Sequence, residues 1–462
     1  MKRRSIQLWA ASLALWAGIT QAQVQYVDPT MGGQGFMLEP TRPTVHLPNS
    51  MVRVYPVRKD QLDDQIRSFP LTIISHRMGE LFWLMPCNGT PDSGTWNRSA
   101  TYDQEQTMPY YYSTRFDGSL IRTEFAPAAR SGYFRFTFPG AKPTVLLANR
   151  SLGSLSIDGT NGISGVEHFN DMQAFVYGEF SSPVSIQERS DAGKTRLTIT
   201  AREGIQDLEF RYGISFISIE QARKNLRMEI PGWNFEKVKR AGKDRWNQVL
   251  GQIEVEGGTP EQKRVFYTSL YRCYERMVNI TEDGKYYSAF DHQVHQDDRP
   301  FYVDNWLWDT YRALEPLQTL LNPQMEADKI QSYVRMYEQL GWMPCFAVLW
   351  GNHPCMTGNH AAPWIADAWS KGVRNFDLQT AYAGVRKNSL EGTWLPWRKG
   401  PKCSLDDFLA EHGYMPALRP GETETVSLVH SFERRQAVSV TLAQSYDDWC
   451  TAQLARSLDK EA

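Results

Sequence analysis

The sequence predicts a chain of two parts, an antiparallel β-sandwich followed by a mainly helical domain. Three observations support this. Apolar residues alternate with polar ones, between turn dipeptides, over roughly residues 25–220. The pattern changes near residue 219, and from residue 257 onward apolar residues recur at helical spacing. At 462 residues the chain is also too long for one compact core.

The alternation is clearest in residues 208–216, where Leu208, Phe210 and Tyr212 are separated by polar residues. This is the period of a strand with one buried face. Residues 134–138 and 197–201 repeat the pattern, and Asn or Asp followed by Gly marks turns at 117–118, 158–159 and 161–162. Many short strands with such turns predict a sandwich over residues 23–219.

Residues 220–226 and 235–250 have helical spacing and are separated by Pro231-Gly232, which predicts linker helices over 220–256. A helix start is predicted at Thr259-Pro260-Glu261-Gln262. Thr259 can cap the helix N-terminus, Pro260 stands at the first helical position, where its missing N–H is not needed, and the Gln262 side chain can bond back to the backbone N–H of Thr259. Apolar residues at helical spacing, which would form an apolar stripe along one helix face, also occur over 330–337 and 378–385. The last such stripe consists of Val438, Leu442, Tyr446, Cys450 and Leu454. These predict a helical domain over 257–462, whose last stripe needs a partner that the following residues do not supply.

The first 22 residues predict an export signal. Lys2, Arg3 and Arg4 precede an apolar stretch, residues 6–19, that is too short to span a bilayer comfortably, and Ala22 offers a small residue at a cleavage point. No later segment is apolar enough to span a membrane. We therefore expect a periplasmic or secreted protein without a stable membrane span.

The composition of the chain limits the classes of binding partner that can be expected. The chain has 50 basic and 52 acidic residues without a long run of one sign, so neither a nucleic-acid partner nor a membrane-surface role is expected. Six cysteines lie far apart; disulfides are permitted, but most are expected to be buried thiols. The 15 tryptophans raise the hypothesis of a carbohydrate ligand, since indoles stack on sugar rings, but composition alone favours the alternative, that they fill large cores.

The segment 304–312 offers the first candidate site. Trp308 and Arg312 are one helical turn apart, and Asp309 beside them could accept hydrogen bonds from sugar hydroxyls while Trp308 offers an apolar platform. The alternative is a carboxylate at a helix start together with core tryptophans.

The loop 350–360, rich in Gly, Asn and His, offers the second candidate. His353 and His360 could act as acid, base or ligand, although their spacing matches no zinc pattern and a packing role is the alternative. The segment 292–298 is interpreted as a solvated polar loop rather than a metal cluster. The adjacent pairs Asp406/Asp407 and Asp447/Asp448 are interpreted as caps and surface charges.

Motifs of other enzyme classes do not occur in a usable context. Neither GxSxG, HExxH, a Walker A loop nor a dinucleotide glycine fingerprint is present, which lowers the rank of serine hydrolases, zinc proteases and nucleotide enzymes.

The chain resembles glycoside hydrolase family 92, the calcium-dependent inverting exo-α-mannosidases. The resemblance is carried, in order, by "ISFISIEQARKNL", "IEVEGGTPEQKRVFYTSLYR", "WDTYRALEPLQTLL", "MYEQLGWMP", "GNHAAPWIADAWSKG" and "SYDDWCTAQLA". It implies an N-terminal β-sandwich, linker helices and, here, an incomplete (α/α)6 barrel. It also implies a mannose-containing glycan as substrate and calcium as cofactor.

Carried over by position, Trp308 and Asp309 match residues that line the family's mannose subsite. Arg312 is expected to support them, and Asn352 and His360 of the second loop are expected to contact substrate. His353 occupies the position of the family's general acid, a Glu that follows the Asn of its "GNxxxxM" loop.

Three departures from the family pattern bear on activity. The opening string GTGGxGHTFPGA is replaced by "MGGQGFMLEPTRPTVHLPN", and "GNHPCMTG" has His353 for Glu in a loop one residue shorter. The general bases and main calcium ligands are expected beyond residue 462, so no metal ligand is expected in this chain. We therefore expect the chain alone to be inactive.

Three alternatives stay open. The chain could be a non-catalytic carbohydrate-binding or scaffold protein. It could belong to a glycosidase whose leaving group needs no general acid, such as a mannose-phosphate diester. It could also be a different (α/α)6-barrel enzyme, a lyase or a phosphorylase, with its own acid and base.

Overall fold

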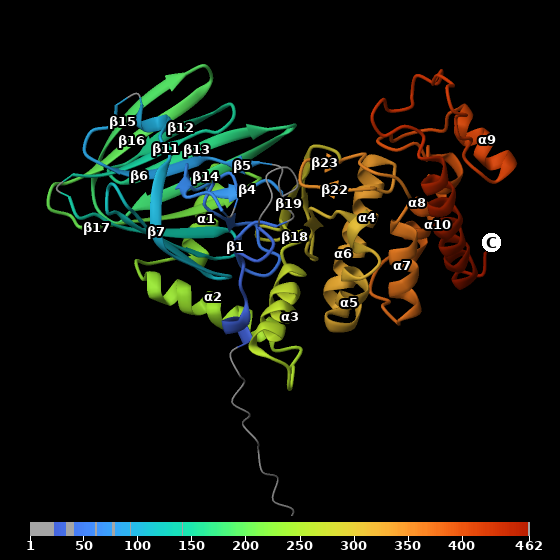
Figure 1. The fold of residues 1–462 in the computed structure, drawn as a ribbon, viewed down its shortest axis with the longest axis horizontal. Coiled ribbons are helices and arrows are strands. Elements are labelled where there is room, and N and C mark those ends of the chain that lie inside the picture. Colours follow the sequence, from blue (N-terminus) through green and yellow to red (C-terminus); the bar gives the residue numbers. More distant parts are fainter. Residues whose placement is uncertain are drawn as a thin grey trace, which may run out of the picture.

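The chain passes from strands to helices along its length, and the two parts lie side by side in Figure 1. The structure is a computed structural model that describes residues 23–33, 41–60, 62–75, 79–92, 94–140 and 142–460. An antiparallel β-rich domain followed by a helical domain is thereby confirmed. The expected signal, residues 1–22, lies outside the described residues.

The larger sheet has nine strands, each antiparallel to its neighbours, in the order β12-β13-β14-β17-β10-β9-β8-β7-β3. Its strands are β3 (Gln65–Ile66), β7 (Ala100–Met108), β8 (Tyr111–Phe116), β9 (Arg122–Pro127), β10 (Ser131–Thr137), β12 (Gly153–Asp158), β13 (Gly162–Phe169), β14 (Met172–Phe180) and β17 (Asp207–Ser215). The predicted strands over 134–138 and 208–216 are β10 and β17, and the Asn/Asp-Gly dipeptides lie at the ends of β8, β12 and β13.

The smaller sheet has four antiparallel strands in the order β15-β16-β11-β6. These are β6 (Trp83–Asn88), β11 (Pro143–Ala148), β15 (Val184–Asp191) and β16 (Lys194–Ala201). Phe134 and Phe210 of the nine-stranded sheet join Val145 and Leu197 of this sheet in one buried core. The apolar faces of both sheets therefore meet. The short pairs β1 (Val45–His46) with β2 (Arg53–Val54), and β4 (Thr72–Ile73) with β5 (Glu80–Leu81), complete this part.

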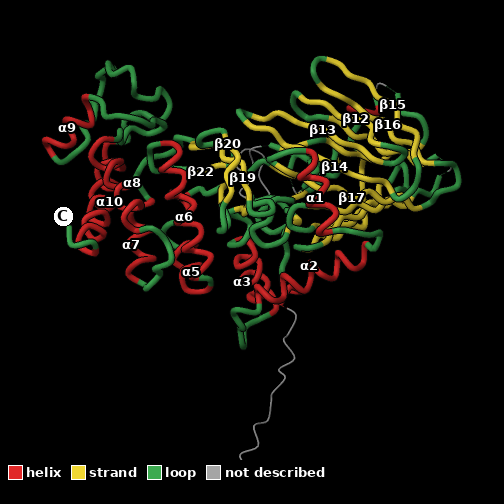
Figure 2. Tube along the Cα trace, turned by 180° about the vertical axis from the view of Figure 1, so that it is seen from behind, coloured by secondary structure: helices red, strands yellow, loops and turns green. Residues whose placement is uncertain are grey.

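Three helices follow the sheets. Helix α1 (Ile219–Glu229) packs against β14 and β17, as Figure 2 shows from behind. Its Ala222 and Leu226 are buried against the sheet. Helix α2 (Phe235–Leu250) packs against β9 and β10 in the interior of the nine-stranded sheet, and α3 (Pro260–Arg272) packs beside it. The capping box at Thr259 and Gln262 is present as predicted. The domain limits 23–219, 220–256 and 257–462 stay predictions.

Short strands occur where the sequence predicted only helices. Between α3 and α4 the chain forms β18 (Val278–Asn279), β19 (Lys285–Ser288), β20 (Gln293–Gln296) and β21 (Tyr302–Val303); β22 (Ala347–Val348) and β23 (Gly351–Asn352) follow α6. The interpretation of 292–298 as a loop is wrong, because most of it is the β20 arm of a hairpin. Tyr286 on the facing strand stacks on Phe301 with ring centroids 3.9 Å apart, which holds this hairpin to the domain.

The helical part contains α4 (Leu307–Thr310), α5 (Leu314–Leu321), α6 (Pro323–Leu340), α7 (Ala361–Ser370), α8 (Leu378–Glu391), α9 (Ser404–His412) and α10 (Ala437–Ser457). Helices α5, α6, α7, α8 and α10 pack side by side, away from the sheets, with α9 at the outer end (Figures 1 and 2). The helices predicted over 330–337 and 378–385 are α6 and α8. A closed (α/α)6 barrel stays a prediction.

The apolar stripe of α10 is only half buried. Val438 is 74% exposed and Leu442 66%, whereas Cys450 and Leu454 are buried against α7 and α8. Residues four apart advance by about 40° around a helix, so the stripe turns through about 160° from Val438 to Leu454. Its two ends therefore face different surroundings.

The six cysteines are free thiols, of which Cys355 and Cys450 are buried and the other four partly exposed. Among the described residues, each helix is too short or too polar to cross a membrane.

Candidate active site

The first candidate segment forms the short helix α4 and the turn after it. Thr310 donates from Oγ1 to Asn305 Oδ1 at 3.0 Å, and Asn305 donates from Nδ2 to buried Glu315 at 3.3 Å. These contacts fix the inner side of the turn. Trp308 and Arg312 lie on the opposite side, and Trp308 is 40% exposed. The core-tryptophan interpretation is therefore wrong for Trp308.

Trp308 and Arg312 line a cavity of about 540 Å3 between α4, α7 and α10. His360 and Asp367 contribute polar groups from α7 and the residue before it, and Tyr446 with Leu442 forms the α10 side. Asp309 is exposed on the same turn but does not line the cavity. The cavity thus combines aromatic faces with charged side chains, which suits a ring that carries hydroxyl groups.

His360 is held rigidly at this cavity. Its ring stacks on Tyr311 with centroids 4.3 Å apart, and its Nδ1 lies 3.1 Å from Asp447 Oδ1. Arg312 in turn donates from Nε to the Tyr311 hydroxyl at 2.7 Å. A chain of contacts therefore runs from Asp447 through His360 and Tyr311 to Arg312, and it fixes the side chains around the cavity.

Asp447 was not predicted to have this role. The interpretation of Asp447 as a surface charge is wrong, since it is fully buried and accepts the backbone N–H of Asn359 at 2.7 Å in addition to its contact with His360. This role could not be predicted because Asp447 lies in the middle of a helix, and the sequence does not reveal which loop that helix faces. Asp406, by contrast, caps α9 as predicted.

The second loop brings Asn352 and His353 together, but neither residue lines the Trp308 cavity. Asn352 accepts the backbone N–H groups of Cys345 and Phe346 at 3.0 and 3.3 Å, so it fixes the fold of the loop. The ring of His353 lies between two indoles, with centroids 6.5 Å from Trp350 and 5.7 Å from Trp397.

This surrounding weakens His353 as an acid. Burial, and to a smaller extent the nearby Lys399 ammonium, lower the pKa of His353 below its usual value. A lower pKa favours the neutral ring at neutral pH, and a neutral imidazole is a poor proton donor to a leaving group.

The N-terminal part contributes a buried anchor to the first candidate segment. Arg53 Nη1 lies 2.8 Å from Asp304 Oδ2, with both side chains buried, and Ser75 donates its hydroxyl to the same carboxylate. Asp304 is the first residue of the segment that carries Trp308. The β-rich domain therefore fixes the start of this segment, although residues 34–40 of the altered opening string lie outside the described residues.

The second histidine segment forms separate contacts. His295 Nε2 lies 2.8 Å from Asp291, and Asp297 pairs with Arg335. Within the described ranges, no three His, Cys, Asp or Glu side chains come together to hold a metal ion.

The chain thus joins a β-rich domain to packed helices, among which lies an aromatic cavity that bears charged side chains. Residues 26–209 match the glycosyl hydrolase family 92 N-terminal domain, and residues 221–462 match the glycosyl hydrolase family 92 catalytic domain. The chain belongs to glycosyl hydrolase family 92.

The chain covers only part of each of three similar proteins. A family 92 inverting mannosidase from Bacteroides thetaiotaomicron VPI-5482 is 28% identical, with a TM-score of 0.85 over 95% of this chain and 63% of the mannosidase. A family 92 α-mannosidase from Bacteroides thetaiotaomicron shares the fold at 22% identity and a TM-score of 0.80, over the same shares of each chain. An uncharacterized secreted glycosidase of Arthroderma benhamiae is 27% identical over 256 residues, which are 54% of this chain and 28% of that protein. The chain therefore spans less than two thirds of each.

Proposed function

We propose that this chain supplies the β-rich domain and the packed helices of an exported α-mannosidase-like glycoside hydrolase that acts on α-mannosides of glycans with inversion. The observation that carries the proposal is the cavity of about 540 Å3 that exposes Trp308 beside Arg312 and His360. In this proposal Trp308 stacks on the sugar ring, while Arg312 and His360 bind its hydroxyls. Asp309 does not line the cavity, and its contact with substrate stays an expectation from the family resemblance. Export places the protein in the periplasm or outside the cell.

Hydrolysis with inversion requires an acid that protonates the leaving oxygen and a base that activates water from the opposite face. The two carboxyl groups lie roughly 6.5–9.5 Å apart in such enzymes. The described cavity presents side chains that grip a sugar, and His353 lies outside it. We therefore propose that this chain binds substrate and that the chain alone does not turn it over.

A calcium cofactor is expected only because of the family resemblance. Because no three candidate side chains gather in the described part of the chain, the residues present do not form a complete site, and no step of the proposal depends on the ion.

Binding of methyl α-mannoside, measured by calorimetry, tests the proposal. Trp308→Ala should weaken binding about tenfold, since aromatic contacts contribute about 1.5 kcal/mol and 1.4 kcal/mol is a factor of ten. Trp233→Ala removes an indole of similar exposure, 38%, at the linker and should change nothing. Equal affinities of the Trp308 variant and the unaltered protein would contradict the proposal.

A second candidate reaction is favoured by His353. A leaving group that is already a good anion, such as the phosphate of a mannose-phosphate diester, needs no protonation. The lowered pKa of His353 fits that case better than an alcohol leaving group. An intact relative carrying this loop should cleave a mannose-phosphate diester and leave plain α-mannobiosides almost untouched; brisk hydrolysis of mannobiosides would exclude this candidate.

Turnover also separates both candidates from a purely binding protein. An intact relative that binds mannosides but cleaves neither substrate would support the non-catalytic alternative.

A further inference from the structure

The Asp447 carboxylate contacts two neighbouring groups behind the cavity of Trp308. Its Oδ2 accepts the backbone N–H of Asn359 at 2.7 Å, and its Oδ1 lies 3.1 Å from His360 Nδ1. Asp447 is fully buried and His360 is 6% exposed. An ionised carboxylate can only accept hydrogen bonds, so the ring nitrogen that faces it has to donate one. The contact therefore assigns a proton to Nδ1 of His360.

The other ring nitrogen of His360, Nε2, then carries a lone pair in the neutral imidazole. Nε2 forms no hydrogen bond with any residue in the described ranges. His360 also lines the cavity of about 540 Å3 that exposes Trp308. A lone pair at such a cavity can accept a hydrogen bond from a hydroxyl group of a bound sugar.

Neighbouring residues fix the orientation of the imidazole ring. One face of the His360 ring stacks on Tyr311, with centroids 4.3 Å apart and planes 13° from parallel. The Nε2 and Cε1 edge lies against Gly358, where an added Cβ would come within 2.4 Å of either atom. Gly358 also has a φ of +102°, a conformation that favours glycine. Glycine at this position therefore leaves the room that the imidazole edge needs.

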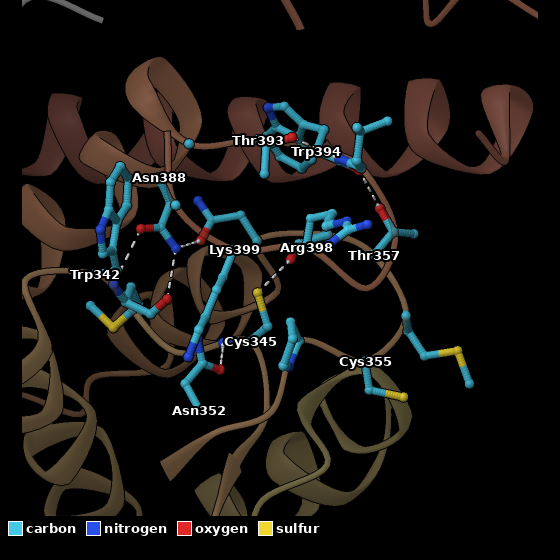
Figure 3. Close-up of a pocket in the computed structure, with 18 residues that line it drawn as sticks. Trp342, Cys345, Asn352, Cys355, Thr357, Asn388, Thr393, Trp394, Arg398 and Lys399 are labelled. Atoms are coloured by element: carbon cyan, nitrogen blue, oxygen red, sulfur yellow. Dashed lines mark hydrogen bonds between the residues drawn. The ribbon is translucent and has the colours of Figure 1, made fainter. Parts of the chain in front are cut away.

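The loop that carries Gly358 is anchored by contacts of its own. Thr357 donates its hydroxyl to Trp394 O at 3.2 Å, and the Cys345 thiol donates to Gly358 O at 3.6 Å (Figure 3). Because neither contact involves the imidazole, the backbone beside His360 keeps its place independently of that side chain.

We propose that Asp447 is a positioning residue that fixes the tautomer of His360, so that Nε2 accepts a hydrogen bond from one hydroxyl of the bound sugar. The cavity then selects a ligand that donates a hydrogen bond at this point, because a group that can only accept would face a lone pair. The inference rests on the proposed function for the sugar. It adds the direction of one hydrogen bond and the residue that sets this direction.

Asp447→Asn should move the proton on the ring. The backbone N–H of Asn359 needs an acceptor, so the new carboxamide oxygen should replace Oδ2 and the NH2 group should face His360. Nδ1 then has to accept, and the proton moves to Nε2. Long-range 1H–15N NMR spectra of histidine-labelled protein show which nitrogen is protonated, at about pH 8.5, where an imidazole is ordinarily neutral. His360→Gln identifies the signals. We expect Nδ1–H in the unaltered protein and Nε2–H in Asp447→Asn.

Methyl α-mannosides with one hydroxyl replaced by fluorine test the contact with the sugar, since fluorine cannot donate a hydrogen bond. At one hydroxyl position, the fluorinated ligand should bind the unaltered protein about tenfold more weakly than methyl α-mannoside in calorimetry, the scale of one lost hydrogen bond. Asp447→Asn should reduce this ratio to about threefold or less and leave the ratios at the other positions unchanged. If Asp447 only supported the fold, its replacement would weaken all the ligands alike.

Asp291→Asn is the matched control. Asp291 also accepts a backbone N–H, from Gln293 at 3.2 Å, and lies 2.8 Å from His295 Nε2, but neither Asp291 nor His295 lines the cavity. This variant should leave every ratio unchanged.

Two results would overturn the inference: a proton on Nε2 but not on Nδ1 of His360 in the unaltered protein, which requires no variant to fold, or the same set of ratios in Asp447→Asn as in the unaltered protein. If methyl α-mannoside does not bind at all, the proposed function fails and the hydroxyl contact fails with it. The NMR spectra then still decide whether Asp447 sets the tautomer of His360.

Discussion

His46 shows how a single buried side chain makes the stability of this chain depend on pH. It lies on β1, fully buried against Trp246 and Tyr271, and its Nδ1 contacts Leu47 O at 2.8 Å. Its Nε2 has no hydrogen-bond partner among the described residues. Protonation would therefore create a buried N–H with no acceptor, and burial lowers the pKa of His46 to about 4.

The lowered pKa sets the direction of the effect. The unfolded chain takes up the proton near pH 6.5, whereas the folded chain resists until about pH 4. Stability is therefore complete above pH 6.5 and is lost as pH falls toward 4, by about 3 kcal/mol at most. We expect urea midpoints at pH 7.5 and 4.5 to differ less in His46→Gln than in the unaltered protein. His168→Gln, at an exposed position, should leave the difference unchanged; a His46 variant with the full difference would contradict this account.

Single residues also show what sequence patterns cannot reveal. Trp308 and Arg312 were predicted as one surface because their spacing is local, and the structure brings them to one cavity with His360. The roles of Asp447 and Tyr311 escaped prediction because they depend on contacts between distant segments: Asp447 lies 87 positions after His360. His353 was expected at the site by resemblance, yet its ring lies between Trp350 and Trp397.

At the scale of elements, a buried charged cluster joins α5 and α6. Lys329 Nζ lies 3.3 Å from Glu315 and 3.2 Å from Glu326, and all three side chains are buried. Trp364 of α7 donates to Glu326 at 2.6 Å. Burial would lower the pKa of Lys329, but the two carboxylates outweigh it and hold the pKa above its usual value. Through Asn305, Glu315 also supports the turn that carries Trp308.

Removal of the Lys329 ammonium should destabilise the fold strongly. Lys329→Met leaves two buried carboxylates without their counter-ion and is expected to cost about 3–5 kcal/mol of unfolding free energy. Lys371→Met breaks the partly exposed pair with Asp367 and should cost less than about 1 kcal/mol. Guanidinium unfolding of both variants measures the difference. Similar losses would show that burial of the cluster is not what makes it important.

Elements with local signals were the predictable ones. The helix start at Thr259, the linker helices and strands such as β10 and β17 follow from capping and from apolar period. The hairpins β18–β21 could not be predicted in the same way. Their strands are two to four residues long, too short for an alternating pattern, and they depend on packing against neighbours, as Tyr286 does on Phe301.

At the scale of the whole molecule, α10 presents an exposed apolar side to solvent. Val438, Leu442 and Tyr446 continue into Trp449, which is 59% exposed. Contiguous apolar surface of this kind promotes association in water. We expect Leu442→Lys with Trp449→Lys to reduce both self-association in light scattering and binding of a hydrophobic dye.

Leu62→Lys replaces a leucine that is 70% exposed in the β-rich part and serves as the control. It should leave association unchanged. If the double variant on α10 associates as strongly as the unaltered protein, this surface does not drive self-association.

The overall order, strands and then helices, could be predicted because each half carries its own period. The arrangement of the halves could not, because it depends on pairs such as Arg53 and Asp304, which are 251 positions apart. Nothing in the local sequence around Asp304 indicates its partner.

That pair has a consequence for recombination between relatives. Asp304 leads directly into the turn that bears Trp308. A foreign β-rich domain without equivalents of Arg53 and Ser75 would therefore leave the buried Asp304 carboxylate without its partners beneath this turn. Chimaeras that exchange this domain should therefore take Arg53, Ser75 and Asp304 from the same parent. The two halves of the chain are expected to be exchanged as one unit.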